Sequence, residues 1–236
     1  LTTNFGLPVM LNTVTTVYPQ PDVETTTVDG KASRQTVNES WTTIRAGAGS
    51  FSRDNQGVEN IAVISSSATT NQYSELHRSF FLFDASAIAD TDNIDSAIFS
   101  LYVVTPIDNN LGGGSVSFVD TTPASNTAIA NSDYANSGTT QQAADVAISS
   151  LVANQYNEWT LNSTGLGNIS KTDVSKFGCR VSNDRSDTEP TWSASVNLGH
   201  NGQTADTADT TQDPKLAVTH TAVVGGASLM PLMGVG

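Results

Sequence analysis

Apolar and polar residues alternate in short runs along most of the chain, and clusters of Gly, Asn, Asp and Pro separate these runs. A period of two residues indicates β-strands, because successive side chains of a strand point to opposite faces of a sheet. The clearest run covers residues 96–104, where both faces carry apolar side chains, so we expect a central strand. Residues 80–83 are continuously apolar, as in a strand covered on both faces.

Similar runs predict further strands, and helical periodicity is hard to find. These strands are expected at residues 13–18, 59–64, 116–119, 158–162, 177–181, 194–198 and 215–219. One short helical turn is expected at residues 166–171. The pattern predicts an all-β protein, an antiparallel β-sandwich of jelly-roll type. Its core is expected to include Phe81, Phe83, Phe99, Leu101, Trp159 and Leu216.

The two ends of the chain are apolar, although chain ends are ordinarily polar and frayed. We therefore divide the chain into an N-terminal arm (1–12), the sandwich (13–221) and a C-terminal tail (222–236). Burial of these ends on a neighbouring subunit is the favoured hypothesis, and packing on the chain's own sandwich is the alternative. The residues expected to make the assembly contacts are Phe5, Leu7, Val9, Leu11, Leu229, Met230, Leu232 and Met233.

Composition narrows the set of partners. The net charge is −13, and the 10 Lys and Arg residues are scattered, whereas nucleic-acid binding needs clustered positive charge. We therefore expect no nucleic-acid partner. No stretch reaches the roughly 20 apolar residues that a membrane span requires, so none is expected. Thr, Ser, Asn and Gln supply most of the polar surface, which is typical of secreted β-proteins.

No pattern in the sequence indicates catalysis. The one cysteine, Cys179, alternates with Phe177 and Val181 and is expected to be a buried apolar residue. His77 and His200 stand alone, and His220 ends a predicted strand. Neither a nucleophile motif nor His or Cys pairs at zinc spacing occur. We therefore assign no catalytic residue.

Two groups of aspartates suggest calcium as a possible cofactor. Asp90, Asp92 and Asp95 place carboxylates along one predicted loop, and hard cations prefer such oxygen ligands. The loop lacks the glycine and the distal glutamate of an EF-hand, so a solvated acidic turn is the competing interpretation. A second, weaker group, in a polar loop, consists of Asp206, Asp209 and Asp213.

Loop aromatics suggest polysaccharide as a possible ligand, because exposed rings stack on sugar faces. Trp192, Trp41 and Tyr73 lie in or beside polar, loop-like sequence, and Trp192 is the first choice. The competing interpretation is a buried tryptophan that holds a loop in place.

Several segments carry a family resemblance. Arg78 precedes Phe80-Phe81-Leu82-Phe83-Asp84, and Ile94-Asp95-Ser96-Ala97-Ile98-Phe99-Ser100-Leu101-Tyr102 enters the next strand. Later come Trp159-Thr160-Leu161-Asn162 and Asp213-Pro214-Lys215-Leu216-Ala217-Val218-Thr219. On these segments, residues 18–221 resemble the DNRLRE-type, carbohydrate-binding-module-like jelly rolls. The chain is also similar to uncharacterised environmental phage structural proteins at residues 27–30, 41–45 and 47–49.

The sequence therefore favours a non-enzymatic structural subunit of a fibre, a surface layer or a virion. It is expected at an extracellular, cell-surface or virion-surface location, as a homo-oligomer or beside other structural subunits. A carbohydrate-binding module or adhesin domain is the alternative, and an enzyme is a distant third. The chain begins at Leu1, which leaves open whether a signal peptide is removed.

Overall fold

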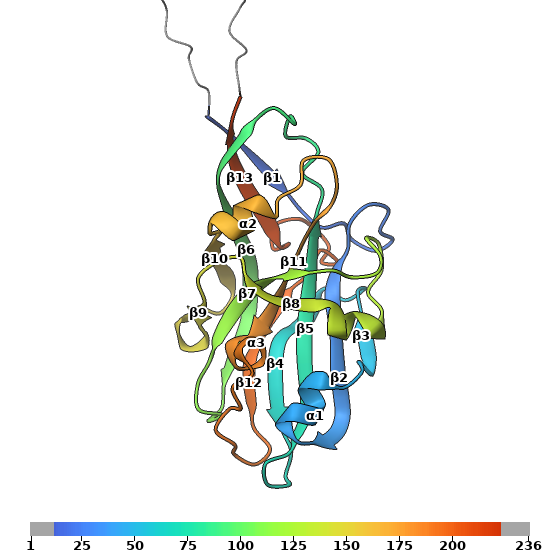
Figure 1. Ribbon diagram of the computed structural model, residues 1–236, viewed down its shortest axis with the longest axis vertical. Helices are drawn as coiled ribbons and strands as arrows, with labels where there is room; N and C mark the ends of the chain where they lie inside the picture. The colour runs from blue at the N-terminus through green and yellow to red at the C-terminus, as the bar shows by residue number, and fades with distance from the viewer. Residues whose placement is uncertain (1–11, 223–236) are drawn as a thin grey trace, which may run out of the picture.

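The computed structural model describes residues 12–222, which form 13 strands in antiparallel pairs (Figure 1). The strands are β1 (Asn12–Val17), β2 (Asp29–Glu39), β3 (Phe51–Arg53), β4 (Val58–Ser66), β5 (Tyr73–Phe83), β6 (Asn93–Asp108), β7 (Ser115–Thr121), β8 (Ser137–Gln141), β9 (Val146–Ala147), β10 (Gln155–Thr160), β11 (Ser175–Val181), β12 (Asn197–Gln203) and β13 (Lys215–Thr221). The helices are short: α1 (Trp41–Ala46), α2 (Ser163–Gly167), α3 (Ser182–Ser186) and the 3₁₀ turns η1 (Asn131–Asn136) and η2 (Ile148–Ser150). The prediction of an all-β protein is confirmed.

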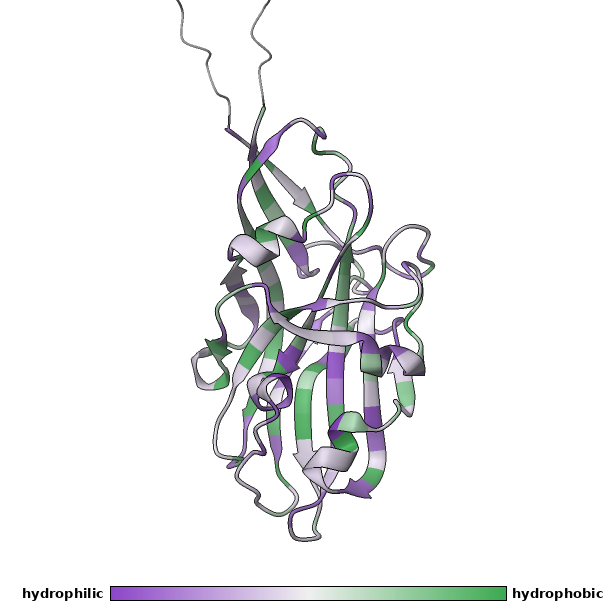
Figure 2. Cartoon of the chain, viewed as in Figure 1, coloured by the Kyte–Doolittle hydropathy of each residue, from purple (hydrophilic) through white to green (hydrophobic). Residues whose placement is uncertain are grey.

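Hydrogen bonds join the strands in the order β1-β13-β6-β12-β4-β5-β11-β7-β8. β6 and β7 lie far apart in this order, yet Phe99 of β6 stacks on Phe118 of β7 with ring centroids 4.3 Å apart. The sheet therefore closes over itself into two layers whose inner faces pack together, as in a β-sandwich. Hydropathy follows the same layering, since apolar and polar residues alternate along many of the strands (Figure 2). The finer jelly-roll assignment stays a prediction.

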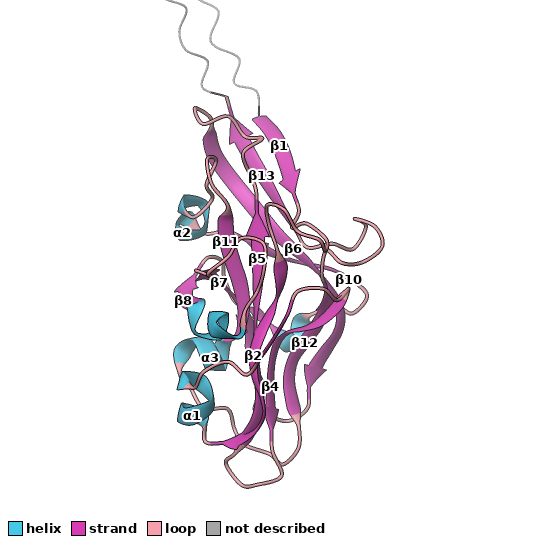
Figure 3. Cartoon of the chain, turned by 90° about the vertical axis from the view of Figure 1, so that its right-hand side faces the viewer, coloured by secondary structure: helices cyan, strands magenta, loops and turns pink. Residues whose placement is uncertain are grey.

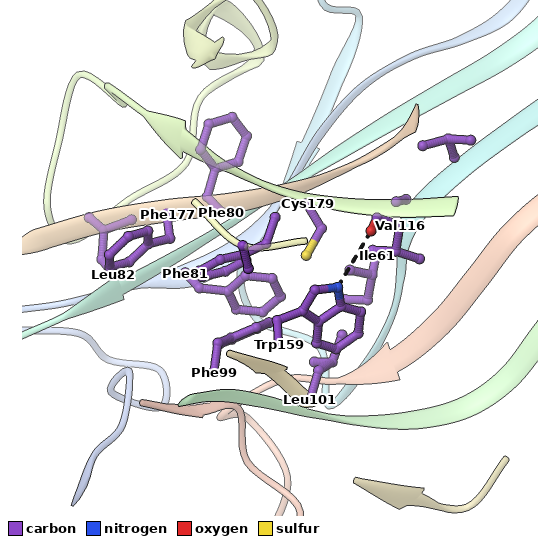
Figure 4. Packing of buried hydrophobic residues seen from close by; sticks show 14 of the residues in the cluster. Ile61, Phe80, Phe81, Leu82, Phe99, Leu101, Val116, Trp159, Phe177 and Cys179 are labelled. Atoms are coloured by element: carbon purple, nitrogen blue, oxygen red, sulfur yellow. Dashed lines mark hydrogen bonds between the residues drawn. The ribbon is translucent and has the colours of Figure 1, made fainter. Parts of the chain in front are cut away.

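The core between the layers is rich in aromatic side chains (Figure 4). All six side chains predicted for it are buried, each at most 1% exposed. Trp159 of β10 packs 5.7 Å from Phe99 and donates its indole N–H to the carbonyl of Val116 at 3.4 Å, so its one polar atom is satisfied across the layers. Cys179 is fully buried, as expected.

β2 is the longest strand that the hydrophobic pattern does not predict. Its sequence is polar, because it buries Asp29, Lys31 and Ser33 in place of an apolar stripe. The Lys31 ammonium is satisfied by the buried Glu59 carboxylate at 2.7 Å. Ion pairing thus keeps charged side chains inside, and a pattern based on apolar residues cannot detect such a strand.

β12 lies later in the chain than predicted, at Asn197–Gln203 in place of residues 194–198. Its segment Gly199-His200-Asn201-Gly202 has the composition of a turn, yet it pairs with β4 on one side and β6 on the other. A Cβ on Gly199 would lie 1.9 Å from the carbonyl oxygen of Ala62. The glycine is therefore needed for close approach of two backbones.

α1, α2 and α3 lie on the same side of the molecule (Figure 3). α3 follows β11 directly, and its buried Asp184 accepts hydrogen bonds from Arg78 of β5 and Arg180 of β11, at 2.7 to 2.9 Å. Arg45 of α1 also bonds to Asp184, so one carboxylate ties α1 and α3 to the sheet. α2 begins at Ser163, before the helical turn predicted at residues 166–171. The Asn162 side chain caps it by accepting from the amide of Gly165 at 2.9 Å.

Candidate functional site

The three aromatics predicted to bind sugar lie near one another, but two of them are buried. Trp41 is 5% exposed and Tyr73 is 0% exposed, and their rings meet edge to face at 5.2 Å. The Tyr73 hydroxyl donates to Pro190 at 3.1 Å, and burial raises its pKa. Neither ring offers a face to a ligand, so the expectation that they are exposed is wrong. Trp192 alone stays partly exposed, with its indole N–H bonded to the carbonyl of Gln72 at 3.1 Å.

The loop of Asp90, Asp92 and Asp95 is organised by protein partners. The ammonium of Lys171 donates to the backbone carbonyl of Asp90 and, at 2.6 Å, to that of Asp92. The Asp92 carboxylate binds His220 at 2.7 Å, whereas the Asp95 carboxylate accepts from the Thr221 hydroxyl. A lysine thus supplies the positive charge at the loop carbonyls, and the carboxylates serve separate partners. This arrangement gives no support to the calcium site predicted there, which stays a prediction.

The second acidic group is divided between surface and interior. Asp209 is exposed, and the Thr211 hydroxyl lowers its pKa. Burial raises the pKa of Asp213 to about 6, and repulsion from Asp209 and Asp206 adds to this. Asp29, which is fully buried and bonds the amide of Ala205, also has a raised pKa, because burial disfavours its charge.

Metal binding has no ready site in this part of the chain. Within residues 12–222, no group of three or more His, Cys, Asp or Glu side chains is arranged to hold a metal ion. Calcium therefore gains no support from the geometry of either acidic group.

His220 has a role that the sequence did not reveal. Its Nδ1 lies 2.7 Å from the Asp92 carboxylate, and its Nε2 lies 2.9 Å from the Thr15 hydroxyl. Since a carboxylate only accepts, Nδ1 donates to Asp92, and in the neutral imidazole Nε2 accepts from the Thr15 hydroxyl. This hydroxyl, imidazole and carboxylate chain has the connectivity of a catalytic triad. Here it joins β1, β13 and the loop before β6, so we interpret it as a tie that holds β1 on the sheet.

The other titratable candidates are enclosed. Burial lowers the pKa of His200 to about 4, and neither of its ring nitrogens has a hydrogen-bond partner among residues 12–222. His77 is buried beside Glu75 at 3.0 Å. Burial raises the pKa of the Cys179 thiol, which makes the reactive thiolate rarer.

β1 is an edge strand of the described sheet, paired through all six of its residues with β13 alone. Its sequence, Asn-Thr-Val-Thr-Thr-Val, contains neither charge nor proline. Val14 is 62% exposed, the second most exposed large apolar side chain among residues 12–222. Natural edges usually carry charges, prolines or bulges that prevent pairing with another chain, and β1 has none of these protections.

Both ends of the described chain lie at the same pole of the molecule. Asn12 of β1 is paired with Thr221 of β13, so the first and the last described strands have their outer ends side by side (Figure 1). The predicted assembly residues Phe5, Leu7, Val9, Leu11, Leu229, Met230, Leu232 and Met233 lie outside the described residues. Their role in assembly stays a prediction, and their link to this pole is that they precede β1 or follow β13 in the sequence.

Comparison with known proteins supplies no family: no protein-family model matches the chain, and no curated protein matches it. The resemblance to DNRLRE-type jelly rolls and to phage structural proteins therefore stays a prediction. Among residues 12–222, the helices are all too short to cross a bilayer. The class that the structure defines is an antiparallel, two-layered all-β protein.

Proposed function

We propose that this chain is a non-enzymatic structural subunit of an extracellular or virion assembly, which joins its neighbours through its terminal arms and the β1 edge. One observation carries the proposal: within residues 12–222, the uncharged edge strand β1, rich in β-branched residues, pairs with β13 alone, and it begins at the pole where both ends of the described chain lie. An extended segment from another subunit adds to such an edge through backbone hydrogen bonds. The occupant we propose is the arm of a second copy of this chain.

The arms have the composition that this role needs. Residues 1–11 precede β1 directly and include Phe5, Leu7, Val9 and Leu11 at alternate positions. Alternate apolar residues suit a strand that pairs at an edge and buries one face. Each large apolar side chain that is buried contributes roughly 1.5 to 3 kcal/mol, which favours association over exposure to water.

Placing a charge on the edge tests this proposal. A lysine on an edge strand blocks pairing because its ammonium resists burial, so Val14→Lys in the full chain should remain monomeric where the wild type assembles. Val152→Lys is the matched control, because Val152 is also exposed (49%) but lies away from β1. Sedimentation velocity and electron microscopy report the assembly.

Two further variants locate the contact. Chains that lack residues 1–11 or residues 223–236 should stay folded, since the strand pairs and the core described above lie within residues 12–222, and at least one should no longer assemble. A wild type that is monomeric at high concentration contradicts the proposal. Equal assembly of Val14→Lys and Val152→Lys contradicts the role of the edge.

A carbohydrate-binding module is the second candidate, and the exposure of Trp192 favours it. This ring is held by its bond to Gln72 and keeps part of its surface open. Binding on a glycan array that is lost in Trp192→Ala and retained in Trp192→Phe would place this function first, since phenylalanine keeps an aromatic face for stacking. Unchanged binding in both variants removes Trp192 from consideration.

A further inference from the structure

A pocket of about 350 Å³ opens between α1, β8 and the outer face of β5 and β11. Three arginine side chains line it, together with small and hydroxylic residues. The arginines are Arg45, Arg78 and Arg180, which are three of the 10 basic residues in a chain of net charge −13. Such a concentration of positive charge is unusual for this protein and requires an explanation.

The carboxylates beside the pocket do not balance its charge. Asp184 is shared by all three guanidinium groups. Asp187, which is 65% exposed at its side chain, pairs with Arg45 alone. Among the ion pairs of residues 12–222, these three positive charges are matched by two negative ones, and one positive charge is left over. A bound anion of charge −1 would neutralise the group.

The pKa of Arg180 reflects repulsion among the three arginines. Burial lowers the pKa of Arg180, and Arg78 and Arg45 lower it further, against the opposing effect of Asp184. Burial alone would raise the pKa of Asp184, but Arg78 and Arg180 outweigh it and hold that pKa well below its usual range. The surroundings of the pocket thus favour negative charge.

Two N–H groups of the pocket arginines have no acceptor within the described part of the chain. A guanidinium has five N–H groups. Arg78 donates through Nε, once through Nη1 to Tyr134 and twice through Nη2, which leaves one N–H on Nη1. Arg180 donates through Nε, twice through Nη1 and once through Nη2, which leaves one N–H on Nη2.

A buried hydroxyl on the pocket wall has no partner. Ser137 is 5% exposed and lines the pocket, and its Oγ makes no hydrogen bond to any residue in the described range 12–222. A buried polar group without a partner costs free energy unless a ligand or water satisfies it. The pocket is also preorganised, because Arg78 is held over the Tyr134 ring at 3.9 Å.

We propose that this pocket binds a small oxyanion, either a carboxylate or a sulfate group, between the guanidinium groups and the Ser137 hydroxyl. Arginine pairs with planar carboxylates and with sulfate or phosphate oxygens through charge-assisted hydrogen bonds, and the hydroxyl supplies a further donor. The group can be a free anion or part of an acidic saccharide. The inference does not depend on the β1 edge, which belongs to a different pole of the sandwich.

Isothermal titration calorimetry of the full chain with sodium glucuronate, sodium sulfate and glucose tests the proposal. Glucuronate and sulfate should bind, whereas the neutral glucose should not. Arg45→Gln removes the most accessible of the three charges and should weaken binding by tenfold or more. Arg185→Gln is the matched control, because Arg185 lies in α3 but pairs with Asp145 and does not line the pocket. This variant should bind the anions as the wild type does.

Ser137→Ala separates ligand binding from a structural role. Loss of an unpartnered hydroxyl should leave the urea midpoint unchanged and weaken anion binding severalfold. Tighter binding of a glucuronate-containing disaccharide than of sulfate identifies an acidic saccharide, and equal affinities identify a simple anion. The proposal is overturned if glucuronate and sulfate bind no better than glucose, or if Arg45→Gln and Arg185→Gln bind equally.

Discussion

Buried aspartates with a raised pKa make this protein less stable as the pH rises, whereas most ion-paired acids have a lowered pKa and stabilise a protein as the pH rises. The folded state holds the pKa of Asp213 at about 6, above its ordinary value of 3.8, because the carboxyl is buried near other acids. Between these two values the folded state binds more protons than the unfolded state. The contribution of Asp213 to the free energy of unfolding is therefore fully present at low pH and is lost as the pH rises from about 4 to about 6.

Asp213→Asn should make this dependence shallower. The amide keeps an oxygen that accepts from the Thr207 hydroxyl, as Asp213 does at 3.2 Å, but it carries no charge to bury. We expect the free energy of unfolding, measured by urea titration, to fall less between about pH 4 and about pH 6 in this variant. Asp90→Asn is the control, since it removes a carboxylate from an exposed aspartate that does not contribute to the raised pKa of Asp213. An equal slope in Asp213→Asn and the wild type would contradict the assignment.

For single residues, the sequence predicted burial correctly where apolar residues alternate, and incorrectly for two aromatic residues that have polar neighbours. Phe99 and Trp159 are in the core because alternation with apolar neighbours specifies one face of a strand. Trp41 and Tyr73 have polar neighbours and yet are buried, because α1 and β5 fold them against each other. The Thr15, His220 and Asp92 contact joins residues up to 205 positions apart, which no local pattern records.

Among the elements, β1 owes its position to side chains as well as to its ladder with β13. The Thr15 hydroxyl is hydrogen-bonded to Nε2 of His220, and removing the hydroxyl takes away this partner of the nitrogen. Thr15→Val should therefore lower the free energy of unfolding by about 1 kcal/mol and speed amide hydrogen exchange in β1.

Thr13→Val is the control for this effect. Thr13 lies on the same strand and is exposed, so the same substitution can be made there at a residue in contact with solvent. Its effect should stay within about 0.5 kcal/mol, as for other surface substitutions. Similar exchange rates in the two variants would show that the hydrogen bond to His220 does not hold β1.

The elements that the sequence predicted share an apolar stripe, and the ones it missed do not. β4, β6 and β13 follow alternation or continuous apolar runs and appear close to their expected positions. β2 was missed because its interior side chains are ionic, and β12 was displaced because its glycines imitate a turn. Propensity describes one strand in isolation, whereas close backbone approach and charge pairing depend on neighbours.

For the whole molecule, net charge opposes the proposed assembly. Copies with a charge of −13 repel one another, and salt screens this repulsion. Raising the ionic strength from about 0.01 M to about 0.1 M shortens the screening length from about 30 Å to about 10 Å. Self-association measured by sedimentation should therefore strengthen with sodium chloride. Weaker association at higher salt would indicate that ion pairs, and not the apolar arms, hold the subunits together.

The pairing of Asn12 with Thr221 also determines how the subunit would respond to tension. Hydrogen bonds between antiparallel strands lie perpendicular to the strands, so a force that pulls these two adjacent ends apart would load one pair of bonds at a time. β1 would then peel from β13 like a zipper, at low force, while the aromatic core stayed intact. A mechanically stable filament would bind both ends of a subunit to the same neighbour, so that tension passes through the sandwich and does not pull β1 away from β13.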